Sequence, residues 1–102
     1  MEDKIQFIND EDFLFEVADF FKVFVDSTRI KILTSLYQGE LCVADLAKKI
    51  GLSQSATSHQ LAMLKSNRLV KFRRDARTLY YSLDDDHIIK IISLAIEHLK
   101  EK

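Results

Sequence analysis

The 102-residue sequence contains no proline, no tryptophan, two glycines and one cysteine. Because proline and glycine break helices and shape loops, their scarcity favours long helices joined by tight turns. The single cysteine, Cys42, excludes an intrachain disulfide and fits a reducing cytoplasm. No segment approaches the roughly 18 consecutive apolar residues of a membrane span, and the amino terminus lacks the features of a secretory signal. We therefore expect residues 1–102 to form one cytoplasmic domain with no membrane partner.

The charged residues are unevenly distributed along the chain, although the net charge is only −1. Residues 1–26 carry eight acidic and two basic side chains, whereas residues 65–77 carry six basic side chains and one acidic side chain. Such a local basic patch is typical of a surface that contacts a nucleic-acid phosphate backbone. A merely solvated charged face is the alternative interpretation. The charge distribution therefore makes double-stranded DNA a candidate partner.

Residues 51–65 carry the pattern that is most informative about function. Gly51 is followed by Ser53, which is a favourable helix N-cap. No charged residue occurs before Lys65, and the first two turns are covered by short hydrogen-bonding side chains, namely Gln54, Ser55, Thr57, Ser58, His59 and Gln60. This helix start suits close approach to base edges, as in the second helix of a helix-turn-helix. A polar solvated face that lacks charge is the alternative.

Two helices are predicted in the first 39 residues of the chain. Residues 11–25 have helical periodicity, and their apolar surface is too large for one helix face, which indicates burial against both the protein's own core and a partner subunit. A second helix is expected to begin with Asp26 or Ser27 as its N-cap and to stop at Gly39.

The remaining periodicities complete a recognisable architecture. Residues 41–50 predict a short amphipathic helix, so that residues 42–65 form a helix-turn-helix. Residues 69–83 contain two strand-like runs joined by a basic tip, which predicts a β-hairpin, the wing. Residues 84–102 predict a final helix, and residues 1–10 an N-terminal arm. The predicted fold class is mainly α with a small β-hairpin, a winged helix-turn-helix.

The final helix contains two histidines, each with a carboxylate neighbour: Asp85 precedes His87, and His98 precedes Glu101. The two histidines are eleven residues apart, which is about 16–17 Å of helix rise, so one straight helix cannot bring both to one ion. Eleven residues are also close to three turns, which places both on nearly the same face. Two antiparallel copies of the helix would therefore bring the two pairs together at two symmetric intersubunit sites.

Two imidazoles and two carboxylates are a plausible tetrahedral ligand set for zinc. The alternatives are that Asp85 is only a helix cap and that His98 and Glu101 are only a solvated pair. Four protein ligands would leave no open metal position, and no separate base or nucleophile is evident nearby. We therefore expect neither an enzyme nor a small organic substrate.

Cys42 and Asp45 lie one helical turn apart and could supply half of a second metal site. Residues 1–41 contain no other cysteine and no histidine to complete it. We interpret Cys42 as a small helix residue and any such site as vestigial.

Motifs over nearly the whole chain, from about Phe13, resemble those of the ArsR/SmtB metal-sensing repressors. The carrying segments are Asp26-Ser-Thr-Arg-Ile-Lys-Ile-Leu33, Glu40-Leu-Cys-Val-Ala-Asp-Leu46, Ser53-Gln-Ser-Ala-Thr-Ser-His-Gln-Leu61, Leu69-Val70 running into Arg73-Arg74, Tyr80-Tyr-Ser-Leu-Asp-Asp-Asp-His87, and His98-x-x-Glu101.

The resemblance implies a homodimer joined through its first and last helices. It also implies a repressor of transcription that binds operator DNA when metal-free and dissociates from the DNA when metal binds. The ligand pattern of zinc-sensing members falls on the four residues reached by geometry, Asp85, His87, His98 and Glu101. Cobalt or nickel could replace zinc, since these ions share ligand types. The DNA-contacting positions correspond to Gln54, Ser55, Ser58 and His59, with Arg74 and Arg77 on the wing.

Two departures from the family pattern are visible. Ala44 stands where cadmium- and lead-sensing relatives have a second cysteine, and Ala76 stands where a wing glycine is usual. The alternative function is a winged-helix regulator that responds to a non-metal signal, with no metal-linked change in DNA affinity.

Overall fold

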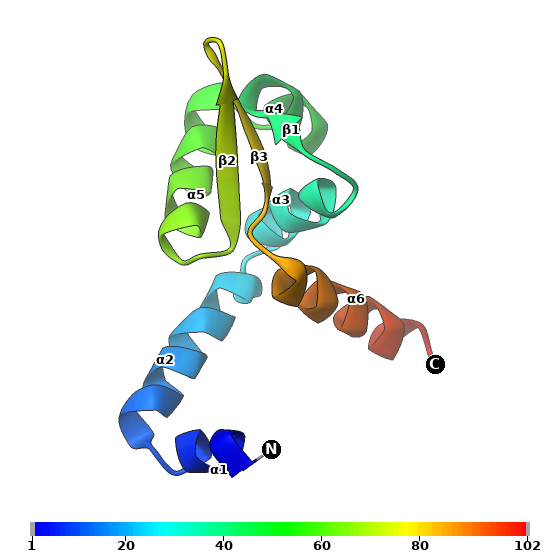
Figure 1. Cartoon of the computed structure of the whole chain (residues 1–102). Helices are drawn as coiled ribbons and strands as arrows, with labels where there is room; N and C mark the ends of the chain where they lie inside the picture. The colour runs from blue at the N-terminus through cyan, green and yellow to red at the C-terminus, as the bar shows by residue number, and fades with distance from the viewer. Residues whose placement is uncertain (1, 102) are drawn as a thin grey trace.

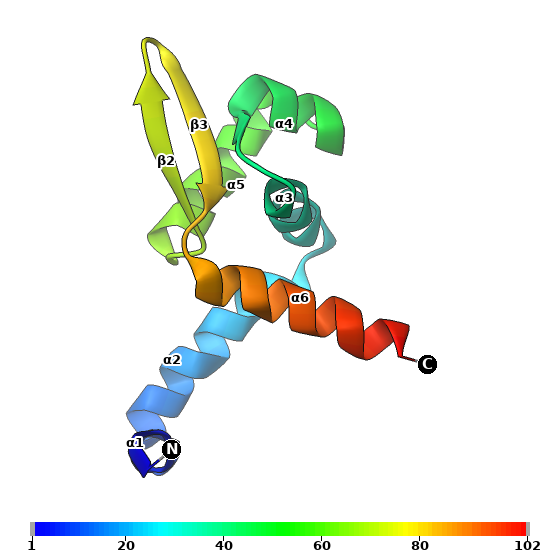
Figure 2. The same ribbon diagram turned by 45° about the vertical axis from the view of Figure 1, so that its right-hand side comes forward.

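The structure is a computed structural model that describes the backbone of residues 2–101. Its elements, in chain order, are α1 (Glu2–Ile8), α2 (Glu11–Lys22), the 3-10 helix η1 (Val23–Val25), α3 (Ser27–Tyr37), β1 (Leu41–Cys42), α4 (Val43–Ile50), α5 (Gln54–Ser66), β2 (Val70–Asp75), β3 (Thr78–Leu83) and α6 (Asp86–Lys100). The helices α3, α4 and α5 gather with the sheet into one body, from which α2 and α6 extend in different directions (Figures 1 and 2).

The helix-turn-helix is shaped by local signals at the junction between α4 and α5. Gly51 has a left-handed backbone with φ 77°, and its N–H donates to the carbonyl of Ala47 at 2.9 Å, which ends α4. Ser53 then caps α5, because its Oγ accepts from the N–H of Ala56 at 3.0 Å. These two residues set the angle at which α5 leaves α4.

The core lies between α3, α4, α5 and the sheet. Its fully buried apolar side chains come from all of these elements: Ile32, Leu33, Leu46, Leu61, Leu64, Leu69 and Val70. Because leucines from both helices of the helix-turn-helix are fully buried in one core cluster with residues of α3 and the sheet, the outward side of α5 is held in one orientation.

The sheet has three antiparallel strands in the order β1-β3-β2. The wing is confirmed, since Asp75 pairs with Thr78 and leaves a two-residue turn. The prediction of a helix from residue 41 was wrong at its start, because Leu41 and Cys42 pair with Tyr81 and Tyr80 as a short strand. The helix begins at Val43 instead, after this pairing has set the chain in an extended conformation.

Within the N-terminal arm, residues 2–8 form the helix α1. Asp10 caps α2 by accepting from the N–H of Phe13 at 3.2 Å. The rings of Phe7 and Phe13 lie 4.6 Å apart and attach α1 to α2.

Large apolar side chains remain exposed on α2 and α6. No residue of α2 is fully buried, and Phe21 is 53% exposed. On α6, Leu94 and Leu99 are 64% and 69% exposed. Such exposed apolar surface is typical of an unfilled subunit interface. Within residues 2–101, no helix has the length and apolar character that crossing a membrane requires.

Candidate nucleic-acid interface and metal-ligand face

The outward side of α5 is polar and short-chained, as the sequence predicts. Thr57, Leu61 and Leu64 are buried and occupy the side that faces the core. The four residues predicted to read DNA are all exposed: Gln54, Ser55, Ser58 and His59. The positive end of the helix dipole lies at the same end as these side chains.

Two further exposed residues on this side of α5, Ala62 and Ser66, are missing from the sequence-based set. They follow Ser55, Ser58 and His59 at spacings of three, four or seven residues and therefore share one helix face. Helical spacing alone could have found them. From Ser55 to Ala62 the outward face of α5 carries no side chain longer than histidine, which leaves this part free to approach a groove closely. Exposed Lys65 follows at the edge of this face, with its ammonium over the ring of Phe72.

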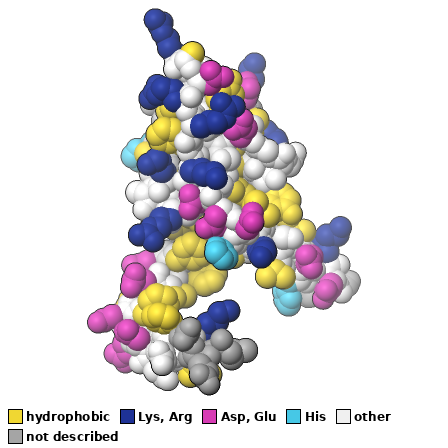
Figure 3. All heavy atoms as spheres, viewed as in Figure 1, with side chains coloured by type: hydrophobic (Ala, Val, Ile, Leu, Met, Phe, Trp, Pro, Cys, Tyr) yellow, Lys and Arg dark blue, Asp and Glu magenta, His cyan; other side chains and the backbone are white. Residues whose placement is uncertain are grey.

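The wing presents basic side chains beyond this helix. Arg74 and Arg77 are exposed, and among the described residues neither side chain makes a hydrogen bond or ion pair. Basic side chains gather over the upper part of the molecule, while acidic ones gather around the lower helices (Figure 3). Ala76, between the two arginines, has a left-handed backbone with φ 56°.

Arg73 differs from its neighbours on the wing because its guanidinium is already paired. Its Nη2 donates to Oε1 of Glu40 at 2.6 Å, and its Nε donates to both carboxylate oxygens at 3.2 and 3.0 Å. The hydrogen bond from Arg73 holds the pKa of Glu40 below its usual range, and the same bond raises the pKa of Arg73. The guanidinium also lies over the ring of Tyr80, 4.7 Å from its centre.

The first half of the predicted metal-ligand set lies at the start of α6. Asp85 is the N-cap: its Oδ1 accepts from the N–H of His87 at 2.9 Å and from that of Ile88 at 3.3 Å. The other oxygen, Oδ2, lies 3.4 Å from Nδ1 of His87. Partial desolvation raises the pKa of Asp85, but the hydrogen bonds from Ile88 and His87 outweigh it, so the pKa lies below its usual range.

The second half of the set lies at the other end of the same helix. His98 is in the last turn of α6, Glu101 is its C-cap, and both are exposed. Within the described residues no three potential metal ligands come together. The structure thus joins Asp85 with His87, and separates this pair from His98 and Glu101 as the helix geometry requires.

The Cys42 and Asp45 pair is split between two elements. Cys42 is half-buried in β1, whereas Asp45 is exposed in the first turn of α4. The two residues are therefore not on one helix face, and the structure brings no third ligand to them among the described residues.

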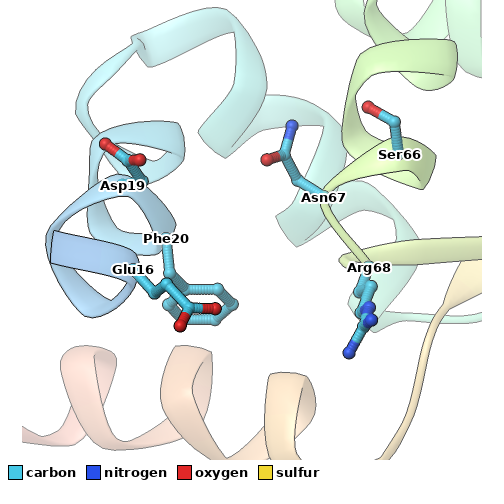
Figure 4. Close-up of a pocket in the computed structure, with 6 residues that line it drawn as sticks. All are labelled: Glu16, Asp19, Phe20, Ser66, Asn67 and Arg68. Carbon is cyan, nitrogen blue, oxygen red and sulfur yellow. The ribbon is translucent and has the colours of Figure 1, made fainter. Parts of the chain in front are cut away.

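A polar groove of about 330 Å³ separates α2 from the end of α5. Glu16 and Asp19 on α2 lie across this gap from Arg68, which follows α5 (Figure 4). Arg68 has a left-handed φ of 63°, and its N–H donates to the carbonyl of Lys65 at 3.0 Å, while Leu69 donates to Leu64 at 2.9 Å. These paired bonds terminate α5 and aim Arg68 at the groove.

A buried helix-turn-helix, an uncharged outward helix face and a basic hairpin define a winged helix-turn-helix DNA-binding protein. The sequence pattern of the family described as "Bacterial regulatory protein, arsR family" matches residues 26–71.

Similar proteins extend this match beyond the helix-turn-helix. The chain is 44% identical over 86 residues to the transcriptional repressor SmtB homolog of Synechocystis sp., an alignment that covers 84% of this chain and 65% of that protein. It is 41% identical over 87 residues to the cadmium resistance transcriptional regulatory protein CadC homolog of Staphylococcus aureus, covering 84% of this chain and 72% of that protein. The chain thus spans a little under two-thirds of the first relative's length.

Solved structures agree with the fold. The crystal structure of NolR from Sinorhizobium fredii matches with a TM-score of 0.78 and 40% identity, covering 85% of this chain and 87% of that one. The homodimeric winged helix-turn-helix domain of Mb0332 from Mycobacterium bovis matches with a TM-score of 0.80 and 31% identity, covering 90% and 89%. The chain belongs to the ArsR family of DNA-binding transcriptional regulators.

Proposed function

We propose that the protein is a metal-responsive repressor, which binds operator DNA as a homodimer when metal-free and is released when zinc, or cobalt or nickel, binds between its subunits. The observation that carries this proposal is the geometry of Asp85 and His87. The similarity to the SmtB homolog and to a cadmium resistance regulator supports it.

The separation between Asp85 and His87 fits two ligands of one tetrahedral ion. Two donor atoms bound at about 2.0–2.1 Å with a tetrahedral angle lie roughly 3.3 Å apart. The observed distance from Oδ2 of Asp85 to Nδ1 of His87 is 3.4 Å. Because Oδ1 of Asp85 is used by the helix cap, Oδ2 is the oxygen that remains for the ion. The cap thus positions the ligand pair before any ion binds.

The second pair of ligands would come from another subunit. His87, Leu94 and His98 lie on one side of α6, since their spacings of seven and eleven residues are close to two and three turns. Exposed Leu94 between the two histidines supplies apolar contact for an antiparallel copy of the helix. In that arrangement His98 and Glu101 of one subunit would complete the site of the other.

The bound ion would supply charge and a fixed link between subunits. Asp85, His87, His98 and Glu101 would then hold the two α6 helices in one relative position. Release of DNA requires that this relative position differ from the one in which both α5 helices fit successive major grooves. An ion that bound both dimer geometries equally well would leave the equilibrium between them, and hence the DNA affinity, unchanged.

On the DNA side, Gln54, Ser55, Ser58 and His59 are proposed to contact base edges in the major groove. Their exposure on one end of α5 supports this assignment. Arg74 and Arg77 are proposed to contact phosphates or the minor groove, because both remain unpaired among the described contacts.

The experiment is fluorescence anisotropy of a labelled inverted-repeat duplex from upstream of the protein's own gene, titrated first in chelator and then in excess zinc. We expect zinc to weaken binding by about tenfold or more, in the range of coupling energies between two sites. His98→Ala and Glu101→Gln should bind DNA normally in chelator and lose the zinc response.

Glu97→Gln is the matched control, because Glu97 is also an exposed carboxylate near the end of α6. It should keep the full zinc response. Equal affinity with and without zinc in the native protein would refute metal sensing and favour the second candidate, a regulator of the same fold that responds to a non-metal signal. The similarity to NolR, whose name mentions no metal, is the observation behind that candidate.

A further inference from the structure

We propose that Glu40 and Arg73 are positioning residues that hold the wing at the angle needed for DNA binding, and that Arg73 is not itself a phosphate ligand. The inference uses only the DNA-binding activity of the family. It does not depend on metal binding.

The first observation is that Arg73 is already occupied. Its guanidinium makes three hydrogen-bond contacts to one carboxylate, with lengths of 2.6 to 3.2 Å. One face of the same guanidinium lies on Tyr80. A phosphate would have to displace Glu40 or bind only the remaining N–H groups, whereas Arg74 and Arg77 need no such exchange.

The second observation is that this contact spans the whole sheet. Arg73 on β2 pairs with Tyr80 on β3, and Tyr80 pairs in turn with Cys42 on β1. Glu40 lies just before β1, next to the turn that ends α3. The side chain of Arg73 therefore crosses over Tyr80 and ties the outer strand of the wing to the α3–β1 corner.

The third observation concerns direction. Successive side chains of a strand point to opposite faces, so Arg73 points away from the face that carries Phe72. The ring centre of Phe72 lies 5.2 Å from the ammonium of Lys65 on α5 and 5.5 Å from the ring centre of Tyr81, so the sheet face that carries Phe72 is turned toward α5. Arg73 is consequently on the side of the sheet opposite α5.

A small change in the angle of the hairpin at its base causes a large displacement at its tip. The strand β1 has only two residues, so backbone pairing across that edge is limited to two residue pairs. From Val70 to the tip the hairpin extends five residues, which is roughly 17 Å at 3.3 Å per residue. A tilt of about 10° at its base would move Arg77 by roughly 3 Å, enough to lose a phosphate hydrogen bond.

The test compares three variants in chelator: Glu40→Gln, Arg73→Gln and the charge-swapped Glu40→Arg/Arg73→Glu. Anisotropy of a labelled duplex, selected by the native protein from a random library, is measured between low and moderate salt. We expect Glu40→Gln and Arg73→Gln each to weaken binding by about twofold to fivefold, with the dependence of log Kd on log salt unchanged. The swapped variant should recover most of the loss.

Glu40→Gln is the decisive variant because it makes the protein more positive. General electrostatic attraction predicts tighter binding to DNA, whereas a positioning role predicts weaker binding. Arg74→Gln is the matched control, and we expect it to reduce the salt slope by about 0.9, as loss of one phosphate contact does.

Three results would overturn the inference. Tighter binding by Glu40→Gln would show that Glu40 masks a DNA-binding arginine. A salt slope reduced in Arg73→Gln as in Arg74→Gln would make Arg73 a phosphate ligand. Unchanged affinity in both single variants would show that the pair of Glu40 and Arg73 has no role in DNA binding. Circular dichroism of each variant establishes that it is folded, and the swapped variant separates loss of the contact from loss of either charge.

Discussion

The tip of the wing offers a quantitative test of the structure, through the substitution Ala76→Gly. Ala76 has φ 56°, in the left-handed region where an L-residue with a Cβ is strained by roughly 1–2 kcal/mol. Glycine removes that strain, but its freedom in the unfolded chain costs about 0.5–1 kcal/mol. Because the Ala76 side chain is exposed, its removal leaves no cavity.

The strain relieved exceeds the entropic cost of glycine, so we expect Ala76→Gly to stabilise the fold by about 0.5–1 kcal/mol. This corresponds to an increase in Tm of roughly 2–6 °C for a chain of this length. Thermal unfolding by circular dichroism measures this change, at fixed protein concentration because any association between subunits makes the Tm depend on concentration. A decrease in Tm would refute the assignment of strain to this residue.

Gly51→Ala is the converse control. Gly51 has φ 77°, and an added Cβ would have no atom within 4 Å, so the substitution costs only conformational energy. We expect a loss of about 1 kcal/mol. A loss of several kcal/mol would mean that the turn between α4 and α5 is crowded, in conflict with the structure.

Two further predictions concern the ion pair and the lone thiol. Because Arg73 lowers the pKa of Glu40 from its ordinary value of 4.5, the pair contributes stability above pH 4.5 and loses it as the pH falls through the lowered pKa. The Tm difference between the native protein and Glu40→Gln should therefore be present at neutral pH and disappear in acid; a difference that persists in strong acid would contradict this linkage. Cys42→Ser should leave the zinc stoichiometry, measured by metal analysis after dialysis, unchanged; a lower stoichiometry would restore Cys42 as a ligand.

The helices were predictable because their ends are local. Asp26 was one of two expected caps for α3, and its Oδ2 indeed accepts from the N–H of Arg29 at 3.0 Å. Ser53 and Gly51 likewise act on neighbours within five residues. In a helix cap, and in a turn that ends a helix at a left-handed glycine, the donor and the acceptor lie within a few residues of each other. A short stretch of sequence therefore contains both partners of the interaction.

The error at the start of α4 has the opposite cause. Leu41 and Cys42 form a strand because Tyr80 and Tyr81, about forty residues later, supply their pairing partners. A two-residue strand has no periodicity of its own, and the following helix extended the predicted pattern backwards across it.

The candidate site shows the same division between local and distant contacts. The exposed polar side of α5 and the contact between Asp85 and His87 follow from spacing on single helices, and the structure has both. The pairing of Arg73 with Glu40 joins residues 33 positions apart, and the alternation of basic and apolar residues in β2 gave no sign of it. Charge counting alone therefore overstates the number of wing arginines that are free for DNA.

The burial pattern of α6 bears on how an ion bound at its ends would act on the α5 helices of both subunits. Ile88 and Ile92 are buried in the core, whereas every residue from Leu94 to Lys100 is exposed. The start of α6, with Asp85 and His87, is thus attached to the body that carries α5, and the end with His98 projects from it (Figure 2). On the proposed function, each ion joins the anchored start of one α6 to the projecting end of the other. The link then runs from one rigid body to the next through a single helix, so that fixing two ion sites fixes the relative orientation of the two α5 helices without any change inside either body.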